Sequence, residues 1–211
     1  MRLKALFTVA ALAGALAFSA CGGGSDGDAG NAASSALRPV DWPLFGRVPE
    51  RTHYLPRRSR SLDPPLRKEW SISTHALIEF PPAVAGGVAY VVNKFGNAKA
   101  VRLRDRKVLW ERVADPRNAG KPTDVTAPVY HRGKVFFAFV DGHLLAVDAA
   151  SGRTAWNRRI NGHLESSPLA VVGALYLGTD TTNAVALRAS DGKVLWNRLL
   201  PSRSESSPLL D

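Results

Sequence analysis

The feature that most constrains this chain is an internal repeat of about 40 residues. Three stretches end on a tryptophan in the same way: AVRLRDRKVLW at 100–110, VDGHLLAVDAASGRTAW at 140–156 and ALRASDGKVLW at 186–196. A proline stands 28 residues before each of these tryptophans, and a glycine follows each proline by five residues. The interval from one tryptophan to the next proline is 12 residues, except after Trp110, where it is 18. An internal repeat has to be interpreted before any other fold signal.

The period and its turn signals predict an all-β fold. Repeats of about 40 residues with several short strands are typical of β-propeller blades. In the middle copy, apolar runs and Gly-containing turns predict strands near 127–130, 134–140, 144–148 and 154–159. A single four-stranded sheet cannot bury both of its faces, so neighbouring blades must stack. We therefore expect four-stranded antiparallel blades of about 40 residues, about three of them here, and an N-terminal closing strand at 66–72.

The turn before each tryptophan carries a resemblance to a known family. The middle copy fits A-x-D-x-x-[S/T]-G-x-x-x-W in full, and the third copy keeps its Ala, Gly and Trp. This pattern resembles the tryptophan-docking motif of pyrroloquinoline-quinone (PQQ)-type propeller repeats, over roughly 66–211. The resemblance implies that the tryptophans dock between blades. The positions concerned are Trp70, Trp110, Trp156 and Trp196, with Ala146, Asp148, Gly152 and Gly192 in the turns.

The first 40 residues predict export. A basic start and an apolar run over 1–20 are typical of a secretory signal, and the run is short for a spanning helix, which needs about 20 apolar residues. Phe18-Ser19-Ala20-Cys21 resembles a lipoprotein box, and Cys21 is the only cysteine. The sequence therefore predicts a lipid-anchored envelope protein, with an ordinary cleavage site or an uncleaved anchor as alternatives. A Gly/Ser-rich linker follows over 21–40.

Residues 41–65 form an N-terminal extension before the partial propeller at 66–211. Its prolines argue against regular helix, and we expect an irregular strap that packs Trp42 and Phe45 onto the propeller. A ligand-binding aromatic pair is the alternative. Because propellers usually have 4–8 blades, we expect the chain to be an N-terminal fragment. A half-propeller that closes by oligomerising is the other possibility.

The net charge of +10 raises the question of nucleic acid. A secretory signal directs the protein away from cytoplasmic nucleic acid, so no such partner is expected. Cationic clusters lie at 57–60 and 102–107, and attraction to anionic lipid or wall polymer stays open. The expected partners are the membrane, through the lipid anchor, and envelope proteins or ligands that the sequence does not identify.

Few residues suggest chemistry. The sequence has no cysteine pair and no C-x-x-C-H motif, and its five histidines have no metal-ligand spacing. No catalytic residue, metal site or cofactor is therefore predicted. Three carboxylates stand three residues before repeat prolines, where the resemblance places them near the channel, and could bind cations or basic groups there; solvated loop positions are the alternative. They are Glu79, Glu165 and Glu205.

Two functions are compatible with these patterns. The favoured hypothesis is a non-catalytic, membrane-anchored scaffold that binds proteins or ligands in the bacterial cell envelope. The alternative is a PQQ-dependent dehydrogenase, for which the resemblance implies PQQ and calcium. The alternative stays open because function belongs to sites rather than to folds.

Overall fold

The computed structural model describes residues 41–55, 64–114 and 121–211, which contain strands and no helix. Blade 1 consists of β1 (Ala83–Ala85), β2 (Val88–Val92), β3 (Asn97–Arg102) and β4 (Lys107–Val113). Blade 2 consists of β5 (Val129–His131), β6 (Lys134–Ala138), β7 (His143–Asp148) and β8 (Thr154–Arg159). Blade 3 consists of β9 (Leu169–Val171), β10 (Ala174–Gly178), β11 (Asn183–Arg188) and β12 (Val194–Leu199).

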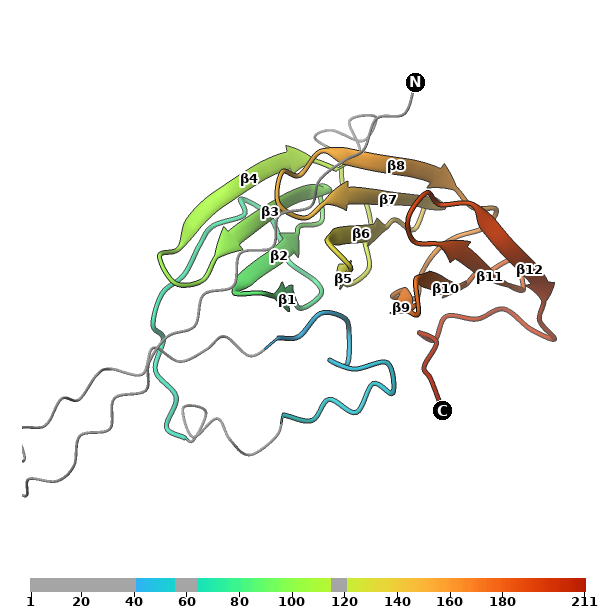
Figure 1. The fold of residues 1–211 in the computed structure, drawn as a ribbon, viewed down its shortest axis with the longest axis horizontal. Helices are drawn as coiled ribbons and strands as arrows, with labels where there is room; N and C mark the ends of the chain where they lie inside the picture. The colour runs from blue at the N-terminus through green and yellow to red at the C-terminus, as the bar shows by residue number, and fades with distance from the viewer. Residues whose placement is uncertain (1–40, 56–63, 115–120) are drawn as a thin grey trace, which may run out of the picture. The chain divides into compact units, whose positions relative to one another are not determined.

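Each blade is a meander whose strands pair antiparallel in chain order (Figure 1). β1, β5 and β9 are the inner strands, with β1 next to β5 and β5 next to β9. The repeat is visible in the register, because Ala100, Ala146 and Ala186 each pair with the tryptophan of the following strand, and the ladder shifts immediately after each alanine. The predicted four-stranded antiparallel blades are confirmed.

Some predicted strand limits were wrong. β6 ends at Ala138 rather than at residue 140, because the chain turns at Asp141-Gly142. Gly142 has φ +91°, and a Cβ there would lie 2.6 Å from the Ile160 carbonyl oxygen, so this turn requires glycine. The stretch 66–72 around Trp70 was expected to be an outer strand, yet it pairs with no strand of the described chain. A fourth strand needs a third strand beside it, and 66–72 has none there.

Two apolar clusters fill the spaces between the blades, and blade 2 contributes to both. Phe136 belongs to the cluster shared with blade 3, while Phe137 belongs to the cluster shared with blade 1. Successive side chains of a strand point to opposite faces. Blade 2 is therefore buried on both faces.

Residues 41–55 form the N-terminal strap, which runs along the inner strands. Trp42 makes an antiparallel bridge with Val84, and the Tyr130 N–H donates to the Pro43 carbonyl at 2.7 Å. The buried anchor of the strap is Leu44. The strap is irregular, as predicted, and Trp42 and Phe45 are half-buried, with their rings against the ring of His53.

Candidate functional site

The two seams between blades are each fastened by a tryptophan. The Trp110 indole Nε1–H donates to the Ala149 carbonyl of blade 2 at 2.9 Å, and the Trp156 Nε1–H donates to the Ala189 carbonyl of blade 3 at 3.0 Å. The two indoles are only 9% and 8% exposed. Each side chain therefore combines apolar burial with a satisfied polar group.

A glycine in the facing turn lets each indole approach. Gly152 and Gly192 have φ +70° and +71°, and a Cβ on either would lie 2.7 Å from a ring atom of Trp110 or Trp156. The Asp148 carboxylate accepts from the Ser151 N–H and hydroxyl, and these bonds lower the pKa of Asp148. Ala146 is fully buried opposite Trp156.

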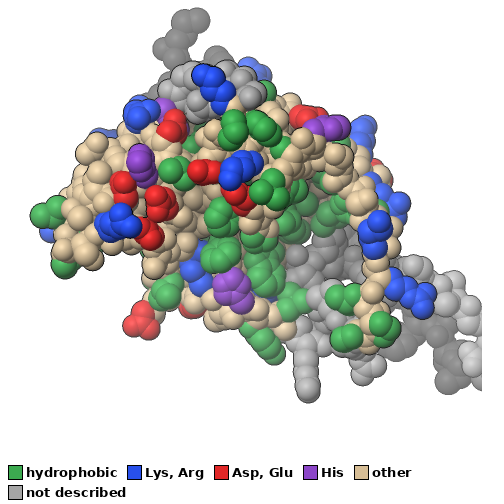
Figure 2. Space-filling view, turned by 180° about the vertical axis from the view of Figure 1, so that it is seen from behind, with side chains coloured by type: hydrophobic (Ala, Val, Ile, Leu, Met, Phe, Trp, Pro, Cys, Tyr) green, Lys and Arg blue, Asp and Glu red, His purple; other side chains and the backbone are tan. Residues whose placement is uncertain are grey.

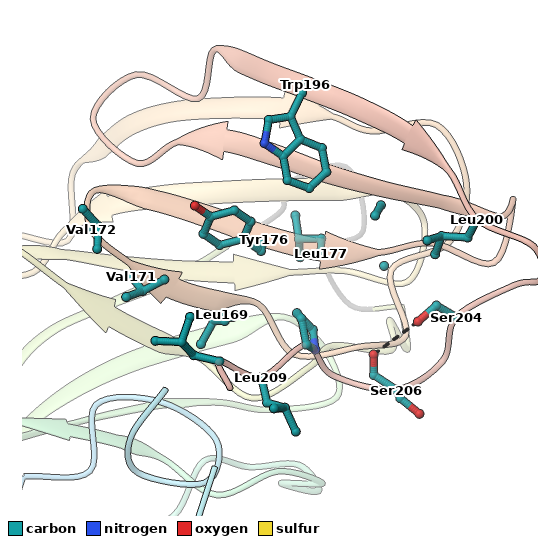
Figure 3. A pocket seen from close by; sticks show the side chains of 14 residues that line it. Leu169, Val171, Val172, Tyr176, Leu177, Trp196, Leu200, Ser204, Ser206 and Leu209 are labelled. Carbon is teal, nitrogen blue, oxygen red and sulfur yellow. Dashed lines mark hydrogen bonds between the residues drawn. The ribbon is translucent and has the colours of Figure 1, made fainter. Parts of the chain in front are cut away.

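Blade 3 presents the same motif without a neighbour among the described residues. Trp196 is 39% exposed, and it borders a cavity of about 550 Å³ (Figure 3). The Tyr176 ring lies beside Trp196 on the cavity wall, with Val171 and Leu209 further along. We call this surface the open face of blade 3. Trp70 is half-buried outside any strand.

The three carboxylates expected near the channel, Glu79, Glu165 and Glu205, do not form a cluster. Glu79 accepts from the Lys94 ammonium at 2.8 Å, which raises the pKa of Lys94, and the same ammonium lies 3.3 Å from Asp124. Glu205 forms an ion pair with Arg203, and Glu165 is exposed. Over 41–55, 64–114 and 121–211, no three His, Cys, Asp or Glu side chains are grouped to hold a metal. Cys21 lies outside the described residues.

An arginine that the sequence did not single out fastens the N-terminal strap. The Arg51 guanidinium donates to the carbonyls of Pro208, Phe45 and Ser167 at 2.6, 2.6 and 3.0 Å. Burial among neutral acceptors lowers the pKa of Arg51. Two of its three partners lie 116 and 157 residues away, so no local pattern could have revealed these contacts.

The equivalent segments around the repeat prolines are also hydrogen-bonded to one another. The Ser167 hydroxyl accepts from the Ala127 N–H at 3.2 Å, and the Ser207 hydroxyl accepts from the Ser167 N–H at 2.9 Å. These residues each precede a repeat proline. Each bond joins two residues that occupy the same position in successive repeats. The two bonds therefore help to fix the alignment of successive repeats.

The surface charge is spread out. Figure 2 shows Lys and Arg scattered over the visible face, with Asp and Glu among them. The arginine group at 57–60 falls outside the described residues. Within the described ranges, no helix is long and apolar enough to cross a membrane.

A protein-family model matches most of the chain. Residues 60–210 fit the family model described as "Outer membrane protein assembly factor BamB". This match covers well over half of the chain and coincides with the three blades.

Curated relatives are quinone enzymes. The chain is 32% identical over 130 residues to the alcohol dehydrogenase (quinone), dehydrogenase subunit, of Komagataeibacter europaeus, a stretch covering 56% of this chain and 17% of the relative. The corresponding subunit of Acetobacter aceti is 28% identical over 159 residues, covering 68% and 21%. The 1-butanol dehydrogenase (cytochrome c) of Thauera butanivorans is 33% identical over 129 residues, covering 56% and 18%. The chain thus spans about a fifth of these relatives.

Solved structures support the fold. A europium-containing methanol dehydrogenase superposes with a TM-score of 0.63 at 22% identity, covering 75% of this chain and 32% of that one. BamB from Moraxella catarrhalis superposes with a TM-score of 0.52 at 19% identity, covering 62% and 40%. At such identities the likeness concerns the fold alone.

These findings correct three predictions. The predictions of a non-catalytic scaffold, of a protein that is more an interaction module than an enzyme, and of no cofactor were all wrong, because the curated relatives are named as alcohol dehydrogenases, most of them with a quinone in the name. The names of these relatives point to a quinone cofactor. The wrong prediction relied on the absence of a recognisable catalytic motif from the sequence, and such an absence does not exclude an enzyme.

Proposed function

The chain belongs to the PQQ-like β-propeller repeat family, and from that premise we propose that it supplies blades of an exported, quinone-dependent alcohol dehydrogenase. The observation that carries the proposal is the 28–32% identity with several relatives named as alcohol dehydrogenases (quinone). The substrate class is a primary alcohol, as in the name of the butanol-oxidising relative.

The described residues contribute structure rather than metal ligands. No three acidic, His or Cys side chains within 41–55, 64–114 and 121–211 are grouped to hold a cation, so these residues by themselves do not fit a quinone–metal centre. Their part is to hold neighbouring blades in register through Trp110 and Trp156 and to fasten the strap through Arg51. Rigid blades are what a propeller enzyme needs to position groups that come from several blades.

A chimera tests this proposal. The matched 130-residue stretch of the Komagataeibacter europaeus enzyme is replaced by the aligned stretch of this chain. We expect the chimera to fold, to bind PQQ in the presence of calcium, and to oxidise ethanol with a dye acceptor. The matched control carries the corresponding blades of the Moraxella catarrhalis propeller and should not bind the quinone. A folded chimera without quinone binding would contradict the proposal.

We also propose that the exported protein is anchored by lipid at Cys21, after a signal at 1–20 and before a linker at 21–40. The support is the lipoprotein-box resemblance together with the lone cysteine. In this layout the extension covers 41–65 and the propeller blades cover 66–211. Labelling with radioactive palmitate should mark the wild type and not Cys21→Ala, and the variant should leave the membrane fraction. Equal labelling of both proteins would exclude the anchor.

A further inference from the structure

The two seams carry grooves in equivalent places, and the grooves differ in chemistry. The groove between blades 1 and 2 has a volume of about 400 Å³ and is lined by Ala85, Gly86, Val88, Tyr90, Leu109, Tyr130, Gly133, Asp148, Ala149 and Ala150. The groove between blades 2 and 3 has a volume of about 280 Å³ and is lined by His131, Arg132, Lys134, Gly173, Arg188, Ala189 and Ser190. We call the second one the basic groove.

Every residue of the basic groove has a repeat equivalent in the first groove. Ala85, Gly86 and Val88 become His131, Arg132 and Lys134 one blade later, and Asp148 becomes Arg188. The single acid of the first groove is thus replaced by a base, and three neutral positions by two cations and a histidine. A general excess of basic residues would place cations in both grooves. Because the basic residues line only the second groove, its positive charge is specific to that groove.

Two consecutive residues of blade 2 reach the same glycine of blade 3. The His131 Nε2 accepts from the Gly173 N–H at 3.2 Å, and the Arg132 guanidinium passes 3.2 Å from the point where a Cβ of Gly173 would lie. Burial and the charge of Arg132 lower the pKa of His131, which favours the neutral ring that the acceptor role of Nε2 requires. Because Nε2 is the acceptor, Nδ1 carries the proton and is available as a donor.

The acids near the groove leave its positive charge available. Asp191 contacts Arg188 at 3.0 Å, but both side chains are about half exposed, and such surface pairs contribute about 0–1 kcal/mol. Asp148 lies opposite Lys134 in the sheet. The carboxylate of Asp148 already accepts a hydrogen bond from the Ser151 hydroxyl. An incoming anion can therefore engage these cations without breaking a buried ion pair.

We propose that the basic groove binds a phosphate group, held between blades 2 and 3. Two guanidinium groups offer forked donors that match phosphate oxygens, and the Lys134 ammonium adds a point charge. The volume suits one small oxyanion group rather than a nucleic-acid strand. The phosphate can belong to a soluble compound or to an anionic lipid headgroup, because the shared chemistry is the same.

Calorimetry and NMR on the full chain test the site. Inorganic phosphate is titrated into the wild type, the variant R132Q/K134Q and the control R198Q, which removes an exposed cation of β12 that does not line the groove. We expect saturable binding in the wild type, about tenfold weaker or absent binding in the double variant, and no change in the control. The ring signals of His131 should shift on binding, and the pKa of His131 should rise beside the anion.

A second arm distinguishes the sources. Vesicles of phosphatidylglycerol in phosphatidylcholine are compared with phosphatidylcholine alone in co-sedimentation. Loss of vesicle binding in R132Q/K134Q with retention in R198Q would assign the phosphate to a headgroup, whereas binding of inorganic phosphate alone would assign it to a soluble compound. The proposal is overturned if neither probe binds, or if both variants weaken binding equally, since the latter indicates attraction to the basic surface as a whole.

Discussion

The seam between blades 2 and 3 and the open face of blade 3 present the same motif in different surroundings. In blades 2 and 3 alike, the tryptophan packs on the aromatic of its own blade, with ring centroids 5.7 Å apart for Phe136–Trp156 and 6.0 Å for Tyr176–Trp196. The alanine pairing and the bulge are also the same. Yet Trp156 is 8% exposed and Trp196 is 39% exposed. The motif thus determines the conformation within a blade, while the neighbouring blade determines the burial.

The largest expected effect comes from replacing each of these two tryptophans by alanine. Trp156→Ala should lower the free energy of unfolding by about 3–5 kcal/mol, because it removes a buried ring and leaves the Ala189 carbonyl without its donor. Trp196→Ala should lower it by about 1–2 kcal/mol, since part of that ring is already in water. Urea unfolding of both variants measures the two values. Equal losses would show that the neighbouring blade adds nothing to the motif.

The next effect separates backbone strain from contact across the seam. Gly192→Ala should cost about 2–4 kcal/mol, because its Cβ combines a positive φ with a clash against Trp156. Gly133→Ala is the matched control, with φ +77° and no atom within 4 Å of its Cβ, and should cost only about 1 kcal/mol. Thermal and urea unfolding compare the two. If they are equally destabilising, the close approach at Gly192 has no energetic weight.

Arg51 tests whether the N-terminal strap supports the end of blade 3. Arg51→Met should lower the free energy of unfolding by about 2–3 kcal/mol, because charge-assisted bonds to several carbonyls are lost. Hydrogen exchange should accelerate at the Leu210 amide, which donates to the Pro49 carbonyl, more than at the Tyr130 amide. Arg153→Met, at an exposed turn position, serves as control. Uniform acceleration along the strap would contradict this role.

The smallest effect is the pH dependence that Asp148 adds at the seam between blades 1 and 2. The Ser151 hydrogen bonds lower the pKa of Asp148 below its unfolded value of about 3.9. Its stabilisation is therefore complete above about pH 4 and is lost as the pH falls through the folded pKa. Asp148→Asn should remove this acid sensitivity from the Trp110 fluorescence, since Gly152 of that turn lies against Trp110. An unchanged acid transition in the variant would assign it to other groups.

The repeat was enough to predict the blades but not everything that joins them. Spacing located each alanine–tryptophan pair, because the same period sets both strand register and docking position. At Trp70 the tryptophan of the motif is present, but no third strand lies beside it among the described residues. Spacing could not find Arg51, whose acceptors are backbone carbonyls distant in sequence, or the basic groove, which depends on which turns face each other. The predicted function was wrong for a different reason, because proteins that share a fold can have different activities.

The neighbouring residues Phe136 and Phe137, one in each apolar cluster, have a consequence for cooperativity. Any change in the tilt or register of β6 alters both clusters at once, so the two seams cannot melt independently. In a nearest-neighbour description of repeat unfolding, blade 2 takes part in both interface energies. Blades 1 and 3 each take part in one interface energy within the described chain. The amides of β6 should therefore be the last to exchange with solvent, and blade 2 is the segment through which a disturbance at one seam is transmitted to the other.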